Sequence, residues 1–378
     1  MTRNAYKIGD ICSIARGTYP TMKTEPGKYP LVVTAAFRRS ASTFQVEGPA
    51  VCVPLISSTG HGDAALHRVH YQEGKFALAN LLVALIPKDK EICNPKYLYH
   101  LLMAKKDEYF VPLMLGTANV SLKEQDIAGV EIALPPLDEQ HRIVSRIEEL
   151  ATKVEEAKSL RQDAIKQAED LLSSKRGEIF KELIAKSTKR LDVAATLERG
   201  KFSHRPRNDQ RFFGGDHPWI QIGEIESAKK FIRGWTETLN DEGLSISRKF
   251  PRGTILVSIA ATIGAVGILD FDCCIPDSIV AVTPKPGTDS EFIFHYFGYV
   301  RSHLEDVAPQ SAQKNINLKI LSGLAFPVVP LTEQRRIVAY LDDLQIKIDA
   351  LKNLQSETAA ELDALMPSIL SRAFRGEL

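Results

Sequence analysis

The chain has 378 residues, of which 44% are hydrophobic and 25% charged, with 48 basic residues against 47 acidic ones. This composition excludes wholesale disorder and low-complexity architecture, and the length predicts two or three globular domains. No apolar run reaches the roughly 18–20 residues that span a bilayer, and MTRNAYKIGD lacks the apolar stretch of a secretory signal, so we expect a cytoplasmic protein. Five cysteines without a CxxC pair predict neither a disulfide framework nor a zinc site, and we expect no metal.

A tandem duplication organises the chain. PLDEQHRIVSRIEEL (136–150) matches PLTEQRRIVAYLDDL (330–344) at 8 of 15 positions, with an offset of 194 residues. Further upstream, GDICSIARG (9–17) resembles LDVAATLERG (191–200), and NLLVALIPK (80–88) resembles DSIVAVTPK (277–285). A period this long indicates two copies of a domain-sized unit and not a solenoid. We therefore expect globular segments at 1–135 and 188–329, and helical segments at 136–187 and 330–378.

The first globular segment is a mixed α/β unit. PAVCVPLI (49–56) predicts a strand, and residues 95–106 predict a helix. Its nucleic-acid contact candidates are basic or polar side chains, while a solvated surface or a plain turn remains the alternative for each. The basic candidates are Arg38, Arg39, His61 and Arg68, and the candidates in the loop GTANVS (116–121) are Thr117, Asn119 and Ser121.

A long helix over 138–185 should follow. Its apolar positions alternate at spacings of four and three residues, which is the heptad pattern of a coiled coil. The expected seam is Ile143, Ile147, Leu150, Val154, Ala157, Arg161, Ala164, Ala168 and Leu171. A helix of about 47 residues runs about 70 Å, which is more than one small domain can cover, so we expect it to pack on the second long helix.

The second globular segment repeats the mixed plan, with a strand in GTILVSIA (253–260) and a helix at 291–304. Its densest basic cluster is RGKFSHRPRNDQR (199–211), and guanidinium groups match phosphate oxygens. A solvated loop is the alternative there, and a turn that positions the helix is the alternative for QSAQKNIN (310–317). The candidates are Arg199, Lys201, Arg205, Arg207 and Arg211, and in the later loop Ser311, Gln313, Lys314 and Asn315.

A second long helix over 332–376 should close the chain, with Pro367 kinking it or ending its regular part. Its expected seam repeats the first at the same offset: Ile337, Leu341, Leu344, Ile348, Leu351, Gln355, Thr358, Leu362 and Leu365. If a pseudo-twofold axis relates the units, the helices run antiparallel and hold the domains apart. Two similar domains at a fixed separation would suit the reading of two half-sites on a double helix.

We find no convincing catalytic motif in the sequence. Asn94-Pro95-Lys96-Tyr97 is similar to the Asn-Pro-Pro-Tyr element of amino-methyltransferases, but it lacks the second proline and a preceding glycine-rich loop. Gly264 and Gly267 form no dinucleotide-binding or Walker loop. A duplicated reader without its own catalysis implies that the chemistry lies in partner subunits.

The duplicated Pro-Leu-x-Glu-Gln helix starts, the SAQKNIN loop and the ending AFRGEL resemble the specificity (S) subunit of type I restriction-modification systems. The resemblance covers the whole chain. It implies two target-recognition domains, an antiparallel coiled coil, and a bipartite, asymmetric DNA site read one half per domain. It further implies two modification subunits that bind S-adenosylmethionine and methylate adenine, and restriction subunits driven by ATP with Mg²⁺, the chain itself needing no cofactor.

Three hypotheses stay open at this point. The first is a non-catalytic DNA reader and scaffold. The second is a freestanding methyltransferase with fused recognition domains, and the third is a coiled-coil interaction protein that does not bind DNA.

Overall fold

The computed structural model describes residues 4–59, 63–116, 120–307 and 316–378. Its contacts divide the chain into two compact units. The first unit comprises residues 1–161 and 356–378, and the second comprises residues 162–355. Each unit therefore combines a globular part with stretches of the long helices, and the four-segment domain division stays a prediction.

The first unit contains ten strands and several helices among its described residues. In chain order they are β1 (Asn4–Lys7), α1 (Ile8–Ile11), β2 (Cys12–Arg16), β3 (Tyr29–Val32), β4 (Arg38–Ala41), β5 (Val46–Glu47), β6 (Ala50–Pro54), β7 (His70–Gln72), β8 (Lys75–Leu78), β9 (Leu82–Pro87), α2 (Pro95–Tyr109), the 3-10 turn η1 (Val111–Leu113), α3 (Glu124–Gly129), β10 (Glu131–Leu134), the first part of α4 (Leu137–Lys186) and α11 (Ala359–Arg375).

The second unit contains the rest of α4 and a matching series of elements. They are β11 (Thr188–Arg190), α5 (Leu191–Ala194), β12 (Ala195–Arg199), the 3-10 turn η2 (Gln210–Phe212), β13 (Phe213–Trp219), α6 (Ile222–Ser227), β14 (Phe231–Ile232), β15 (Glu237–Leu239), α7 (Asp241–Ser245), β16 (Lys249–Phe250), β17 (Ile255–Ser258), β18 (Val266–Leu269), β19 (Cys273–Cys274), β20 (Ile279–Pro284), α8 (Ser290–Val307), α9 (Leu318–Ser322), β21 (Ala325–Pro327) and α10 (Leu331–Glu357). The expected strands at 49–56 and 253–260 and helices at 95–106 and 291–304 are confirmed as β6, β17, α2 and α8.

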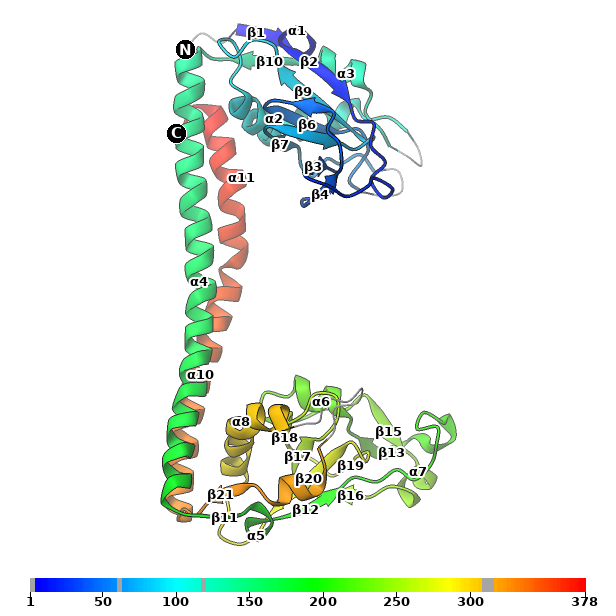
Figure 1. The fold of residues 1–378 in the computed structure, drawn as a ribbon, viewed down its shortest axis with the longest axis vertical. Coiled ribbons are helices and arrows are strands. Elements are labelled where there is room, and N and C mark those ends of the chain that lie inside the picture. Colours follow the sequence, from blue (N-terminus) through cyan, green and yellow to red (C-terminus); the bar gives the residue numbers. More distant parts are fainter. Residues whose placement is uncertain (1–3, 60–62, 117–119, 308–315) are drawn as a thin grey trace. The chain divides into compact units, whose positions relative to one another are not determined.

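The sheets repeat the duplication seen in the sequence (Figure 1). The first unit has sheets of order β2-β9-β6-β7 and β4-β3-β8-β5, and the second has β12-β20-β17-β18-β14 and β15-β13-β19-β16. The strand directions agree as well, because β3 and β8 pair in parallel as β13 and β19 do, while the other paired neighbours they share are antiparallel. Only β14, which extends the larger sheet of the second unit, has no counterpart among the described strands of the first.

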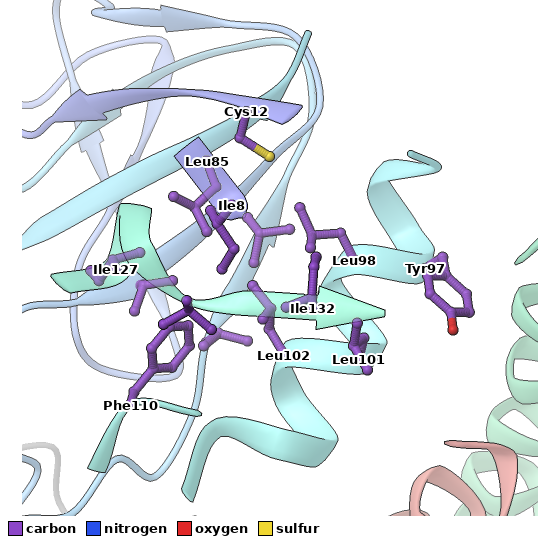
Figure 2. Close-up of a cluster of buried hydrophobic side chains, with 14 of the residues drawn as sticks. Ile8, Cys12, Leu85, Tyr97, Leu98, Leu101, Leu102, Phe110, Ile127 and Ile132 are labelled. Carbon is purple, nitrogen blue, oxygen red and sulfur yellow. The ribbon is translucent and has the colours of Figure 1, made fainter. Parts of the chain in front are cut away.

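The main core of the first unit lies between the sheet of β2 and β9, helix α2 and strand β10. Figure 2 shows Ile8, Leu98, Leu102 and Ile132 pointing toward one another in this core. Tyr97 points away from them toward the long helices, where its ring meets that of Phe374 on α11 edge-on at 5.4 Å. The start of α4 and the end of α11 are thus held against the globular part by apolar burial.

The second unit repeats this packing with aromatic side chains. Phe180 of α4 is fully buried, and its ring centroid lies 5.1 Å from that of Phe292 and 5.8 Å from that of Tyr296, both on α8. Ile337 and Leu341 of α10 join the same core. The long helices are therefore part of each unit's core and also contact each other.

The long helices pack antiparallel within each unit. In the first unit, Arg142 near the start of α4 donates to the backbone oxygen of Leu378, and Lys158 further along pairs with Asp363 at 3.0 Å. In the second unit, Glu169 pairs with Lys352 of α10 at 2.5 Å. Arg176, further along α4, lies near Asp342, which is earlier in α10. The antiparallel direction predicted from the repeat is confirmed in each unit.

Most residues of the predicted heptad seam are buried or half-buried, but the last residue of each series is exposed. Leu171 and Leu365 are 49% and 43% exposed, whereas the next residues face inward: Leu172 is 7% exposed, and Met366 packs on the first unit's core. An α-helix with 3.6 residues per turn drifts about 20° per heptad against a 3.5-residue repeat, so four heptads bring the neighbouring position onto the packed face. Of the other seam residues in the prediction, some are buried (Ile143, Ile147, Val154, Ile337, Leu341, Ile348) and the rest half-buried (Leu150, Ala157, Arg161, Ala164, Ala168, Leu344, Leu351, Gln355, Thr358, Leu362).

The second long helix is interrupted, which corrects the expectation of one helix over 332–376. Thr358 separates α10 from α11 with φ −91° and ψ 3°, and its hydroxyl accepts from Arg161 at 2.6 Å. Pro367, by contrast, lies inside α11, which continues to Arg375. Proline removes one backbone donor and crowds the preceding turn, but here the helix continues past that local defect.

Candidate nucleic-acid interface

Three of the five basic candidates at 199–211 converge on one turn. Arg205 donates to Asp277 Oδ2 at 3.0 Å, Arg207 donates to Asp277 Oδ1, and Arg199 donates to the backbone oxygen of Asp277. Asp277 lies in the turn between β19 and β20. Because three guanidiniums surround one carboxylate, the cluster keeps a net positive charge at this turn.

The other two basic candidates lie on the same loop. Arg211 approaches Asp209 at 3.3 Å and lies 4.5 Å over the Phe212 ring, while Lys201 is exposed. Asp209 also accepts from the backbone of Arg211, which fixes η2. The loop is thus ordered by local contacts that leave exposed cationic surface.

The arginine turn adjoins the end of the second candidate loop. Ile316 donates its backbone N–H to Ile259 O, and Ile259 in turn donates to Ser278 O, both at 3.0 Å. These two consecutive backbone hydrogen bonds, which we call a backbone relay, bring the end of the 310–317 loop beside the Asp277 turn. Asn317 caps α9 through Ile320 N at 3.0 Å. The candidates Ser311, Gln313, Lys314 and Asn315 lie outside the described residues.

The first unit repeats this relay at corresponding positions. Leu122 donates to Leu55 O, and Leu55 donates to Leu81 O, both at 2.8 Å. Ser121, at the end of the loop, exchanges two backbone hydrogen bonds of 2.9 Å with Leu115 and is exposed. Its neighbours Thr117 and Asn119, and His61 of the other loop, lie outside the described residues.

A groove of about 710 Å³ with mixed polar and apolar lining lies along this relay in the first unit. Ser121, a contact candidate from the sequence, is one of its lining residues, and its contact with DNA stays a prediction. The others with polar side chains are Arg16, Asn80, Lys123, Glu124 and Gln125, none of which the sequence analysis selected. The internal repeat could have identified two of them from the sequence, because it aligns Arg16 with Arg199 and Asn80 with Asp277.

A smaller groove of about 360 Å³ flanks the arginine turn of the second unit. It combines the guanidinium of Arg207 with amide side chains and the Trp219 ring. Its other polar lining residues are Asn208, Gln210, Gln221, Glu237 and Ser278, and Gln221 Nε2 donates to Glu237 at 2.8 Å. Amide and guanidinium side chains can bind base edges and phosphates, whereas Trp219 is buried in the fold.

Two of the other three described basic candidates in the first unit, Arg38 and Arg39, form hydrogen bonds within the fold. Arg38 donates to Gln72 Oε1 at 3.0 Å and to Tyr71 O at 3.2 Å, so it links β4 to β7 of the other sheet, and burial lowers its pKa. Arg39 donates to Thr21 O at 3.3 Å, and Arg68 is half-buried. DNA contact by these three residues stays a prediction.

The tetrapeptide that is similar to a methyltransferase element has a structural role here. Asn94 Oδ1 accepts from Lys96 N at 2.9 Å and from Tyr97 N at 3.1 Å, which caps α2. Tyr97 is 1% exposed and packs on Phe374. The amide and the ring that would hold a substrate base are therefore both occupied by the fold.

The cysteine thiols are buried within the fold. All five cysteines are free and buried, and burial raises the pKa of Cys52 to about 12, so at neutral pH that thiol is protonated and a poor nucleophile. Within residues 4–59, 63–116, 120–307 and 316–378, no group of three His, Cys, Asp or Glu side chains is placed to hold a metal ion. No helix in the same ranges is both long and apolar enough to cross a membrane.

Known proteins share both the sequence and the fold of this chain. It is 27% identical over 354 residues to a putative type I specificity subunit of Mycoplasma pneumoniae, covering 91% of this chain and 90% of that protein. It is 25% identical over 338 residues to the EcoBI specificity subunit of Escherichia coli, covering 80% of this chain and 69% of the relative.

Two solved structures resemble the fold. The HsdS subunit from Thermoanaerobacter tengcongensis superposes with a TM-score of 0.57 at 22% identity, covering 100% of this chain and 97% of that one. A chain from a type I R-M system, solved to explain complex assembly and conformational transition, gives a TM-score of 0.69 at 23% identity, covering 100% and 98%.

The family signature appears twice, as the duplicated fold requires. The sequence profile of the type I restriction modification DNA specificity domain matches residues 3–167 and again residues 192–359. Each match takes in one candidate site, with its strand ends and backbone relay. The chain therefore belongs to the specificity-subunit family of type I restriction-modification systems and carries two target-recognition domains.

Proposed function

We propose that this chain reads a bipartite, asymmetric DNA sequence, one half-site with each unit, and has no catalytic activity of its own. The observation that carries the proposal is the duplicated site at the β8–β9 and β19–β20 turns, where a backbone relay joins each turn to a polar loop. A duplicated site on a duplicated fold suits a target with two parts.

The chemistry of the two sites supports two different half-sites. The first groove offers Arg16, Asn80 and Lys123, while the second turn carries an arginine cluster around Asp277. Asparagine and glutamine suit adenine edges, and arginine suits guanine edges or phosphates. Because the side chains differ at corresponding positions, the two half-sites should differ in base sequence.

The long helices would serve as spacer and scaffold. We expect two modification subunits to dock on them and on the adjacent domain faces, with restriction subunits joining the assembly. S-adenosylmethionine, ATP and Mg²⁺ would then be bound by those partners and not by this chain. Because its substrate would be the cell's own double-stranded DNA, we place the complex in the cytoplasm.

DNA binding by the purified complex tests the reading role. The full chain assembled with its modification subunits should bind one DNA sequence in preference to others, and its affinity should fall steeply with salt as counterions are released. Equal affinity for all sequences would contradict sequence reading. Absence of DNA binding would instead support a coiled-coil scaffold without a DNA-binding role.

Assay of the chain alone tests the absence of catalysis. Labelled S-adenosylmethionine and DNA should give no methyl transfer, and calorimetry should detect no cofactor binding, until the modification subunits are added. Methyl transfer by the chain alone would contradict the proposal and favour a freestanding methyltransferase.

A further inference from the structure

We propose that Asp277 is a positioning residue of the second unit's DNA interface, which orients Arg205 and Arg207 and does not itself contact DNA. The inference rests on the proposed function and adds the device that orders its basic cluster. An acid in an anion-binding surface opposes DNA through its charge, so its presence there calls for a compensating role.

The contacts show how Asp277 fixes the two guanidiniums. Its two carboxylate oxygens are divided between them, Oδ2 to Arg205 at 3.0 Å and Oδ1 to Arg207. Arg205 is held further by Phe202 O at 2.6 Å and His204 O at 2.7 Å. Held by three acceptors, its guanidinium has one defined orientation and not the many rotamers of a free arginine.

The arginines remain available after this pairing. Their side chains are 52% and 48% exposed, while that of Asp277 is only 28% exposed. A guanidinium carries five N–H donors, so N–H groups not directed at Asp277 can still meet a phosphate or a base edge. With Arg199 bound to its backbone oxygen, Asp277 is surrounded by three cations, and the cluster keeps a net charge of about +2 at neutral pH.

The chain contains its own comparison at the same turn. The first unit has Asn80 where the second has Asp277, and Arg16 where the second has Arg199. The first unit's groove has no arginine cluster among its described lining residues, and its turn carries an uncharged amide. The acid thus occurs at the turn that gathers arginines and is absent from the turn that does not.

The test compares Asp277→Asn with Asp216→Asn in the full chain assembled with its modification subunits. Asp216 is an exposed carboxylate on β13 with no ion pair among the described side chains, so both variants remove one negative charge. Binding is measured to a duplex carrying the mapped target and to duplexes with either half-site scrambled. Asp277→Asn should weaken target binding about tenfold or more, with non-specific binding unchanged or stronger. Asp216→Asn should leave the discrimination between duplexes within about twofold.

Two further variants separate positioning from damage to the fold. Asp277→Glu keeps the charge and should restore most of the discrimination. In an Arg205→Gln/Arg207→Gln background, Asp277→Asn should change discrimination by less than about twofold, because the residue acts through those arginines. A full additional loss in that background would overturn the inference.

The outcomes also separate this inference from the proposed function. If the unaltered complex does not discriminate between duplexes, the proposed function fails. If it discriminates and Asp277→Asn behaves like Asp216→Asn, only the positioning role is overturned.

Discussion

Two buried glutamines show how single residues connect helix and domain. Gln140 is fully buried at the start of α4, where its Nε2 donates to Ile92 O and Pro135 O, both at 2.9 Å. Its Oε1 accepts from Asn94 N at 2.9 Å. This one amide therefore satisfies three backbone groups and fixes the entry of the helix against the start of α2.

Gln334 repeats the arrangement in the second unit. Its Nε2 donates to Val329 O at 2.8 Å and Gly287 O at 3.0 Å, and its Oε1 accepts from Asp289 N at 2.8 Å. Asp289 then caps α8 as Asn94 caps α2. In both copies, the glutamine of the Pro-Leu-x-Glu-Gln motif thus joins the start of the long helix to the globular part by buried hydrogen bonds.

Gln334→Ala should lower the free energy of unfolding of the second unit by about 2–4 kcal/mol, because it leaves three backbone groups without partners in a buried site. Both tryptophans of the chain, Trp219 and Trp235, lie in this unit, so denaturant unfolding followed by their fluorescence reports on it. Gln167→Ala, at an exposed position of α4, is the matched control and should stay within about 0.5 kcal/mol. Equal stability of the two variants would contradict the fastening role.

The motif predicted where each helix begins, but not what its glutamine does. The helix starts follow from local sequence, and α4 begins at Leu137 and α10 at Leu331. The partners of Gln140 lie up to 48 residues away, which no local pattern encodes. Likewise Arg38 was selected for its charge, whereas its sheet contacts depend on strands that meet only in the folded unit.

At the scale of elements, the packed face of each long helix shifts by one residue from the predicted heptad positions toward the far end of the predicted seam. Leu172 and Met366 occupy corresponding positions of the repeat and both turn inward, while Leu171 and Leu365 turn out. The shift therefore belongs to the duplicated unit and not to one helix. The sequence predicts a heptad stripe but not its drift, since drift depends on the actual winding of the helix.

Leu172→Ala should cost about 2–4 kcal/mol of unfolding free energy, because it opens a cavity in the second unit's core. Leu171→Ala removes the same atoms from a half-exposed position and should cost less than about 1 kcal/mol. Alanine favours helix at both positions, so helix propensity is matched. A larger loss for Leu171→Ala than for Leu172→Ala would contradict the inward position of Leu172 and support an uninterrupted heptad seam.

An ionic network joins α8, α10 and Lys230, which directly precedes β14, in the second unit. Lys230 pairs with both Glu291 and Asp342, the latter at 2.6 Å, and His295 Nε2 lies 3.0 Å from Asp342 Oδ1. Arg176 approaches the other ring nitrogen of His295 at 3.5 Å. Since arginine only donates, His295 is held as the neutral tautomer with its proton on Nε2.

This network predicts loss of stability on acidification. Burial lowers the pKa of His295 below its ordinary value of 6.5. As pH falls below about 6.5, the unfolded chain therefore binds a proton more readily than the folded unit does, and the free energy of unfolding decreases. Although burial alone would raise it, hydrogen bonds from His295 and Lys230 lower the pKa of Asp342 to about 2, so its contribution is present above about pH 4 and lost between about 4 and 2.

Tryptophan fluorescence in urea at a series of pH values measures this dependence. The unfolding free energy should fall below pH 6.5 with a slope of at most about 1.4 kcal/mol per pH unit from His295. His295→Gln should remove this first decline and leave the one below pH 4. An unchanged profile in His295→Gln would show that His295 is not its source.

At the scale of the whole molecule, the duplication separates reading from spacing. The sites lie at turns within the globular parts, whereas α4 passes from one unit into the other as a single helix of 50 residues. The fold class and the antiparallel direction were predictable because the repeat is visible in the sequence. The pseudo-twofold arrangement and the role of the helices as a fixed spacer stay predictions.

Insertion of one heptad into the middle of α4, with a matching heptad in α10, should change the length of the unspecific gap in the DNA target. Both half-sites should keep their base sequence, because the insertions leave each turn and its relay intact. Methylation mapping of the variant measures gap and half-sites together. A changed half-site would contradict the separation of spacer from reader.

The most direct test of the account is to co-express the chain with its modification subunits and map methylated adenines by single-molecule sequencing. We predict a bipartite motif with two different half-sites separated by an unspecific gap. Replacing residues 188–329 with the equivalent segment of another family member should change one half-site only. A short continuous motif, or a change in both half-sites after the replacement, would contradict the reading of one half-site by each unit.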